Sequence, residues 1–257
     1  MDDETGDYTG FDLELAEAVC EIYGWKLVKT PINWDAKDTE LNSGAIDCIW
    51  NGFTMNGRED DYTWSDPYVD NSQVMVVSEN SGINSLSDLA GKTVGVQAAS
   101  AALDLLQSEE DGGQKELADT FAALQQFPDY NNAFVELQAG SIDAVAMDIG
   151  VAKYQLESRG EGYKILDEHL NSEKYAIGFK KGNTELRDTV QTTLLGMLYD
   201  GTFEKIAKKW ELTDSMCLSM DDKTYVDGGK VPEPDTSKLT KKSENTQADD
   251  AATESAG

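Results

Sequence analysis

The sequence predicts an α/β protein with largely parallel sheets, and three observations support this prediction. Apolar residues switch repeatedly between the two-residue period of a strand and the longer period of a helix. Several predicted helices stop at a glycine, which readily adopts the left-handed conformation of a helix end. The motif ELNSGAID at 40–47 returns as ELQAGSID at 136–143, each time leading into an apolar segment. An alternation of predicted strands and helices along the chain is typical of sheets covered by helices.

The individual elements follow from these patterns in chain order. A helix is predicted over 11–23, because Leu15, Val19 and Ile22 share one face and Gly24 stops it. Strands are predicted where apolar residues alternate or run together, and helices where they recur every three or four positions. The remaining predictions are strands over 25–32, 46–50, 92–97, 120–127, 142–147 and 175–181, with helices around 40–42 and over 100–107, 129–140, 149–160, 184–201 and 203–210.

The composition limits the classes of partner. The 49 acidic and 21 basic residues give a formal net charge of −28, which repels nucleic acid and anionic membrane surfaces. A hydrophobic content of 39% supports a packed core, and no apolar run approaches the ~20 residues that span a bilayer. From about Val231 the chain lacks aromatic residues and periodicity, so we predict a disordered acidic tail over 232–257.

The cysteines and the single histidine do not predict a metal site. Cys20, Cys48 and Cys217 lack CxxC spacing, and we expect buried thiols, with a pair that involves Cys217 as the alternative. His169 has no second imidazole or thiol near it in sequence, so we expect it on the surface. The sequence predicts neither a cofactor nor a catalytic residue.

Polar residues at predicted strand ends are the candidates for ligand binding, because ligands of open α/β sheets bind beyond the carboxyl ends of strands. Arg58 follows a glycine-containing turn after the strand at 46–50. Its guanidinium is suited to a forked pair with a ligand carboxylate, and the alternative is a local salt bridge to Glu59 or Asp60. Asp148 ends the strand at 142–147, where it is either a helix N-cap or the acceptor for an ammonium group.

Two further residues stand at comparable positions. Ser100 is predicted to cap the helix over 100–107, whose first N–H groups favour an anion. Trp34 is an aromatic residue at the end of a predicted strand, and the sequence suits a core residue and a pocket wall equally well.

Five segments resemble the bacterial extracellular solute-binding proteins that deliver polar amino acids to ABC importers. The resemblance covers roughly residues 6–212, and the five segments occur in the order of that family. They are GFDLELAEAV, LNSGAIDCIWNGFTMNGRED, WSDPYVDNSQVMVV, SLSDLAGKTVGVQAASAALDLL and LRDTVQTTLLGMLYDGTFEKIAKKW.

The resemblance implies a type II periplasmic-binding-protein-like fold, with two α/β lobes of mixed, mostly parallel sheets that close on the ligand like a hinged trap. Crossover strands near 73–77 and 175–179 would join the lobes. Lobe 1 would comprise 1–76 and 177–231, and lobe 2 would comprise 77–176. The repeated motif would then mark equivalent helix–strand units of two facing lobes.

The resemblance also implies the ligand contacts. Arg58 would bind the α-carboxylate, with Thr54 and Ser100 adding hydrogen bonds, and Asp148 would accept the α-ammonium group. Carbonyl groups near Asn51 and Gly52 would assist Asp148. The full predicted ligand-binding set is Trp34, Asn51, Gly52, Phe53, Thr54, Arg58, Gln97, Ala98, Ser100, Ala101 and Asp148.

Three features depart from the family pattern. Thr54 and Arg58 are four residues apart instead of five, which indicates a rebuilt loop. Ala101 stands where relatives carry a small or hydroxyl-bearing residue, so one hydrogen bond is expected to be absent. Relatives begin with a strand that this sequence lacks, and we expect truncation at the N-terminus.

The resemblance implies an extracytoplasmic, lipid-anchored or periplasmic monomer that passes a small amino acid to an ABC transporter permease. Two alternatives share the fold. One is a sensor module that reports ligand occupancy to a signalling partner, and the other is an enzyme similar to cyclohexadienyl dehydratases.

Overall fold

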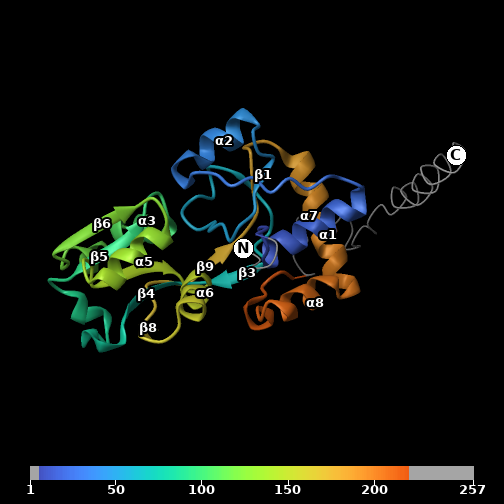
Figure 1. Ribbon diagram of the computed structural model, residues 1–257. Coiled ribbons are helices and arrows are strands. Elements are labelled where there is room, and N and C mark those ends of the chain that lie inside the picture. Colours follow the sequence, from blue (N-terminus) through green and yellow to red (C-terminus); the bar gives the residue numbers. More distant parts are fainter. Residues whose placement is uncertain (1–5, 220–257) are drawn as a thin grey trace, which may run out of the picture. The chain divides into compact units, whose positions relative to one another are not determined.

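The computed structural model describes residues 6–219, which form two compact units (Figure 1). The described part of the first unit comprises 6–31, 46–69 and 176–219, and the second unit comprises 32–45 and 70–175. The predicted tail at 232–257 lies outside the described residues. The lobe boundaries that the resemblance implies stay a prediction.

The first unit packs three helices with a small antiparallel sheet. The helices are α1 (Phe11–Tyr23), α7 (Thr184–Asp200) and α8 (Thr202–Lys209). The strands β1 (Cys48–Ile49), β10 (Gly178–Phe179) and β2 (Thr63–Trp64) pair in that order, antiparallel throughout. Leu15 and Val19 are buried as predicted, and Phe203, Ile206 and Ala207 bury one face of α8.

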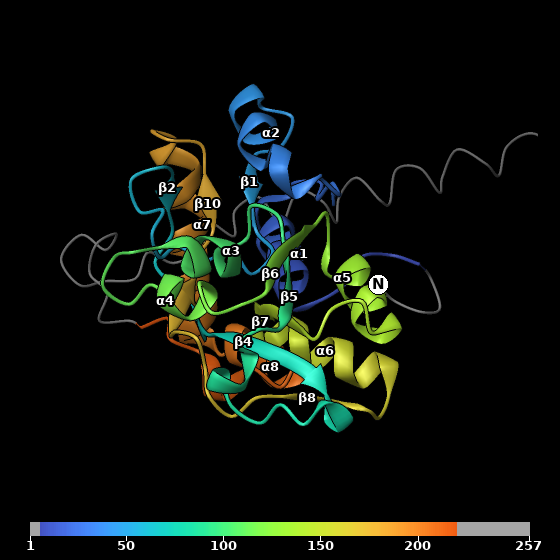
Figure 2. The same cartoon turned by 90° about the vertical axis from the view of Figure 1, so that its left-hand side faces the viewer.

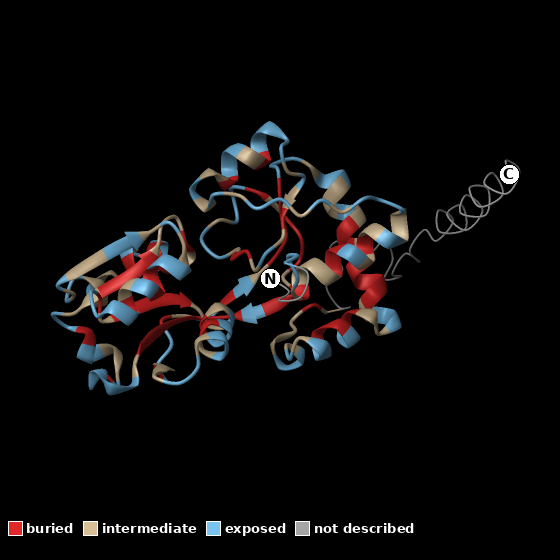
Figure 3. Ribbon diagram, in the orientation of Figure 1, coloured by how far each residue is buried: buried red, intermediate tan, exposed pale blue. Residues whose placement is uncertain are grey.

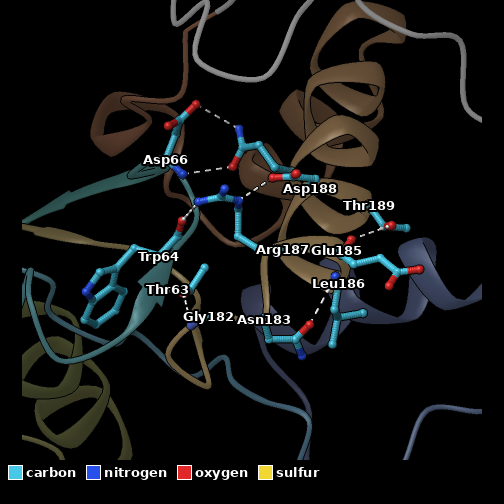
Figure 4. Close-up of polar contacts among 11 residues, drawn as sticks. Thr63, Trp64, Asp66, Gly182, Asn183, Glu185, Leu186, Arg187, Asp188 and Thr189 are labelled. Carbon is cyan, nitrogen blue, oxygen red and sulfur yellow. Dashed lines mark hydrogen bonds and ion pairs between the residues drawn. The ribbon is translucent and has the colours of Figure 1, made fainter.

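Polar contacts tie α7 to the segment after β2 (Figure 4). The Arg187 guanidinium donates to the carbonyl of Trp64 at 3.0 Å and pairs with Asp188. The Gln191 side chain accepts from the backbone N–H of Asp66 at 2.9 Å and donates to the Asp66 carboxylate at 3.1 Å. These bonds satisfy buried polar groups, so they fix the position of β2 against the helix.

The second unit is built on a five-stranded mixed sheet. The strand order is β6 (Ala123–Phe127), β5 (Thr93–Gln97), β7 (Ala144–Asp148), β4 (Gln73–Ser78) and β8 (Tyr163–Ile165). The parallel pairs are β5 with β6 and β5 with β7, whereas β4 is antiparallel to both of its neighbours. The predicted parallel arrangement is therefore confined to three strands of this sheet.

Helices cover both faces of this sheet (Figure 2). Helices α3 (Ala101–Gln107) and α4 (Lys115–Ala118) lie on one side, and α5 (Tyr130–Ala139) and α6 (Ile149–Arg159) lie on the other. Successive residues of β4 point to opposite faces, so Met75 belongs to the core under α3 and Val74 to the core under α5. The buried residues, red in Figure 3, accordingly gather along the sheet.

Shorter elements complete the described chain. The strands β3 (Val69–Asn71) and β9 (Glu173–Tyr175) pair with each other, and two of the four points at which the chain passes between the units lie within β3 and at the end of β9. The helix α2 (Lys37–Ser43) follows a single 3₁₀ turn, η1 (Trp34–Ala36). Further 3₁₀ turns are η2 (Glu79–Ser81), η3 (Leu86–Leu89) and η4 (Thr213–Ser215).

The repeated motif marks the same helix end twice. Gly44 after α2 and Gly140 after α5 are both left-handed, with φ of 79° and 73°. In each copy the glycine N–H bonds to the motif's leucine carbonyl, and the next N–H bonds to the motif's glutamate carbonyl. This is the Schellman arrangement, which explains why Glu, Leu and Gly recur at fixed spacing.

The strand predicted over 25–32 is wrong, because the structure has no strand there. The Val28 side chain is 68% exposed, so the apolar residues of this run lack the half-buried surface that a strand requires. The segment is held instead by side chains: the Lys29 ammonium donates to the carbonyl of Tyr8 at 2.8 Å and pairs with Glu17.

The three cysteines form no disulfide, and the single histidine lies at the surface. No disulfide joins Cys20, Cys48 and Cys217, and each is half-buried. His169 is exposed, as predicted. No helix among residues 6–219 is long and apolar enough to cross a membrane, and these residues contain no cluster of histidine, cysteine and acidic side chains suited to a metal ion.

Candidate functional site

Asp148 is the centre of a polar cluster in the second unit. It ends β7 and holds the N-cap position of α6, yet its side chain makes no capping hydrogen bond. Its Oδ1 instead accepts from the Asn71 amide at 3.0 Å, the Gln73 amide at 2.9 Å and the Tyr175 hydroxyl at 2.8 Å. The Tyr130 hydroxyl donates to Oδ2 at 3.3 Å. The N-cap alternative for this carboxylate is therefore wrong.

Glu173 is a second carboxylate of this cluster, and the sequence reasoning missed it. The side chain is 2% exposed, and its Oε1 accepts from the amides of Asn71 and Gln73, both at 2.6 Å. Asn171 donates to Oε2 at 3.2 Å. Burial, and then repulsion by Asp148, raises the pKa of Glu173. The available signal was the alternation in β9, which places Glu173 on the same side as Tyr175.

The two phenols act as neutral donors. Burial, followed by the negative charge of Asp148, raises the pKa of Tyr130 and of Tyr175 well above the ordinary value. Both therefore keep their protons and donate to the Asp148 carboxylate. Amide and phenol groups hold the acidic cluster in place without neutralising it, so its chemistry suits a positively charged ligand group.

The loop from Gln97 to Ala101 lies in the same unit. Ser100 caps α3 as predicted, because its Oγ accepts from the Leu103 N–H at 3.2 Å. Ala99 has a φ of 54°, which is rare for a residue with a side chain. The Ala98 N–H donates to the carbonyl of Phe127 at 2.8 Å, and the Gln97 amide lies 3.4 Å from the carbonyl of Pro128. Ser100 is buried, and Gln97, Ala98 and Ala101 are partly exposed.

Trp34 contacts this loop directly. Its indole N–H donates to the carbonyl of Ala99 at 3.0 Å, and the Lys37 ammonium lies 5.2 Å from the ring centre. Trp34 begins η1 and does not end a strand, contrary to the prediction. The ring is half-buried, so it is not a core residue, and its polar bond fixes one edge of the indole.

Arg58, the residue predicted to bind a ligand carboxylate, lies in the first unit. Its guanidinium stacks 5.4 Å from the ring centre of Phe53 and donates to the carbonyl of Thr54 at 3.4 Å. Its own carbonyl accepts from the indole of Trp64 at 3.0 Å. Arg58 is half-buried, and these contacts fix both its backbone and its side chain.

The Phe53 ring, on which the Arg58 guanidinium stacks, belongs to the core of the first unit. This side chain is fully buried and packs edge-on against Tyr62, with the ring of Trp64 beside it. Position 178 is a glycine because a Cβ atom there would lie 2.8 Å from the Phe53 ring. The Phe53 side chain is therefore part of the core. Thr54 is also buried, Gly52 has a left-handed φ of 71°, and Asn51 is exposed.

Asp12 supports the start of the same loop, and sequence reasoning missed it as well. The Tyr68 hydroxyl donates to its Oδ1 at 2.6 Å. Burial raises the pKa of Asp12 to about 6, although hydrogen bonds from Tyr68, the Gly52 backbone and Trp50 oppose the shift. Its position in α1 offered no signal, since an acidic residue in the first turn of a helix is common.

We expect the folding stability to fall between about pH 4 and pH 6 because of Asp12. In this interval the folded protein binds more protons than the unfolded chain, so the free energy of unfolding decreases as pH rises. The decrease should be on the order of 1–3 kcal/mol, and the Asp12→Asn variant should lose it. Urea unfolding of both proteins across this interval measures the difference, and parallel curves would contradict the assignment.

Comparisons with known proteins agree with these features. The sequence model of the bacterial extracellular solute-binding proteins, family 3, matches residues 1–213. The L-cystine-binding protein TcyA of Bacillus subtilis (strain 168) is 30% identical over 81% of this chain and 75% of its own. The arginine-binding extracellular protein ArtP of the same organism is 31% identical over 80% of this chain and 79% of its own.

Solved structures show the same fold. A histidine-bound substrate-binding protein of an ABC uptake transporter from Streptococcus pneumoniae superposes with a TM-score of 0.77, at 33% identity over 84% of this chain and 88% of that one. An ancestral amino-acid-binding protein described as a precursor of cyclohexadienyl dehydratase gives a TM-score of 0.71, at 29% identity over 82% and 88%.

These matches define the chain as a solute-binding protein with the predicted two-lobed α/β fold class. It belongs to family 3 of the bacterial extracellular solute-binding proteins. The relatives named above are binding proteins, not enzymes.

Proposed function

We propose that this protein binds a polar amino acid outside the cytoplasm and delivers it to an ABC importer. The observation that carries the proposal is the state of Asp148. This carboxylate occupies a helix N-cap position without capping the helix, and four neutral donors hold it beside a second buried carboxylate. A carboxylate fixed in this way is suited to the α-ammonium group of an amino acid.

The α-carboxylate of the amino acid is assigned to Arg58. Its guanidinium is positioned by Phe53 and by the Thr54 carbonyl, and a planar guanidinium pairs with a carboxylate through two parallel hydrogen bonds. Both charges of a zwitterion lose water on binding, and each then requires a partner of opposite charge. Phe53 is proposed to take part through its stacking contact with Arg58. The further proposed ligand contacts are Trp34, Asn51, Gly52, Thr54, Gln97, Ala98, Ser100 and Ala101.

We propose a hinged closure of two lobes over the amino acid as the mechanism. Closure would be favoured by the ligand to the extent that both charge pairs form only in the closed state. The proposed partner is the permease of an ABC transporter, and the protein is proposed to act as a monomer at the outer face of the cytoplasmic membrane or in the periplasm. The family and the similarity to TcyA, an L-cystine-binding protein, and to ArtP, an arginine-binding extracellular protein, support this assignment.

Catalysis is the second candidate, and one comparison favours it. The neighbour described as a precursor of cyclohexadienyl dehydratase shares the fold at 29% identity. This neighbour is itself described as an amino-acid-binding protein, so fold alone does not choose between the activities. We propose binding without turnover, and incubation with prephenate should leave the substrate unchanged.

Thermal unfolding in the presence of single amino acids tests the proposed function. The screen uses the standard amino acids together with cystine and ornithine. A ligand at about 100 times its Kd stabilises a protein by about 2.7 kcal/mol, which corresponds to a rise in Tm of roughly 5–10 °C. We expect one compound or one chemical class to give this rise. No rise with any compound would contradict amino-acid binding.

A further inference from the structure

The carboxylates of Asp148 and Glu173 share their hydrogen-bond donors. One N–H group of Asn71 and one of Gln73 go to each carboxylate, at 2.6 Å for Glu173 and at 2.9–3.0 Å for Asp148. Because both carboxylates contact the same two nitrogen atoms, they lie within the range in which one negative charge disfavours another. Glu173 is the more deeply buried of the two.

The same cluster contains an acceptor that lacks a donor. The Gln73 side chain is fully buried, and its Oε1 has no hydrogen-bond partner among the described residues, although its Nε2 contacts both carboxylates. A buried carbonyl without a donor costs free energy. The cluster therefore holds acceptors in excess, and an ammonium group brings three donors at once.

Glu173 lies near one other carboxylate and two phenols. Asp148 faces Glu173 from the end of β7. The hydroxyl groups of Tyr130 in α5 and Tyr175 in β9 donate to the Asp148 carboxylate. The amides of Asn71, Gln73 and Asn171 donate to the Glu173 carboxylate. The neighbouring Lys174 is exposed and pairs with Asp70 at 2.7 Å, and strand alternation directs it to the opposite side of β9.

We propose that Glu173 carries a proton in the unliganded protein at mildly acidic pH, and that an ammonium group bound at Asp148 displaces this proton into the solvent. This inference rests on the proposed function and extends it. Glu173 is a positioning residue: protonated, it relieves the repulsion within the cluster, and ionised, it adds a second negative charge behind Asp148. The Glu173 O–H bond breaks, and the proton passes to water or buffer.

The direction of the pKa shift agrees with this geometry. Burial and the charge of Asp148 raise the pKa of Glu173, and a nearby ammonium charge would lower it again. Binding then releases protons, so the affinity falls as pH decreases below the pKa of the unliganded protein. The fall approaches about tenfold for each pH unit in this range.

Titration calorimetry in buffers of different ionisation enthalpy counts the released protons. The probes are L-arginine, L-glutamine and L-cystine, titrated between about pH 5 and pH 7, below the range in which amino groups lose their protons. We expect the wild type to release a fraction of one proton at the acidic end of this interval. The Glu173→Gln variant should release none and should keep a pH-independent affinity. The control variant, Glu157→Gln on the exposed side of α6, should behave as the wild type.

Infrared spectroscopy tests the protonated state without a ligand. The unliganded wild type should show a carboxylic-acid carbonyl band at mildly acidic pH that Glu173→Gln lacks, and a bound probe should abolish it. Binding of a probe without proton release, or absence of the band, would overturn this inference and leave the proposed function intact. If none of the three probes binds, the proposed function fails for these three ligands only, and the infrared band alone then decides whether Glu173 holds the proton.

Discussion

Replacing Asp148 with alanine is expected to weaken amino-acid binding by roughly 30-fold or more. Removing one partner of a desolvated charge pair costs about 2–5 kcal/mol, because the ammonium group is then buried without its counter-charge. The loss is expected in affinity and not in folding, since removal of Asp148 also relieves its repulsion of the buried Glu173. Titration calorimetry with the amino acid that gives the largest thermal shift measures the effect.

The matched control for this variant is Asp119→Ala. Asp119 pairs with Lys115 on the surface of the same unit at 2.7 Å, and exposed pairs of this kind contribute about 0–1 kcal/mol. The control variant should therefore bind with unchanged affinity. A wild-type Kd for Asp148→Ala, measured on a protein with a normal unfolding transition, would remove Asp148 from the proposed site.

The helices and the buried strands could be predicted because their signals are local. Gly24, Gly44, Gly140 and Gly201 end their helices in the left-handed conformation, and Ser100 caps α3. Such signals depend on a few adjacent residues, so a single sequence contains them. The segment at 25–32 shows the limit. Its pattern suits a strand, but a strand also needs a neighbouring strand, and no local pattern specifies one.

The polar cluster shows the same limit for the site. Asp148 was identifiable because it follows an apolar strand, whereas Glu173 lies 25 residues later in an inconspicuous segment. Their relation depends on Asn71 and Gln73, which β3 and β4 bring to the same place. Whether Asp148 caps its helix or turns toward these amides also depends on the tertiary structure. The contacts between segments far apart in the sequence are therefore the part of the site that could not be predicted from the sequence pattern.

Arg58→Ala is expected to weaken binding of the same amino acid by roughly 30-fold or more, through loss of the partner of its carboxylate. Arg58→Lys should recover only part of this loss, because an ammonium group keeps the charge but not the planar fork that binds two oxygen atoms. The unfolding transition is the control for folding, because the guanidinium also stacks on Phe53 and donates to the carbonyl of Thr54.

Arg159→Lys provides a matched control for Arg58→Lys. The guanidinium of Arg159 stacks on a phenylalanine in the same way, 4.9 Å from the ring centre of Phe134, and it belongs to no part of the proposed site. Arg159 also donates to the Gln155 side chain at 2.7 Å, so its lysine variant reports on Kd and not on matched stability. If stacking alone explained the role of Arg58, neither lysine variant would change Kd. A change in Kd confined to the Arg58 variants would instead assign the ligand carboxylate to this guanidinium, because both arginines stack on a phenylalanine but only Arg58 belongs to the proposed site.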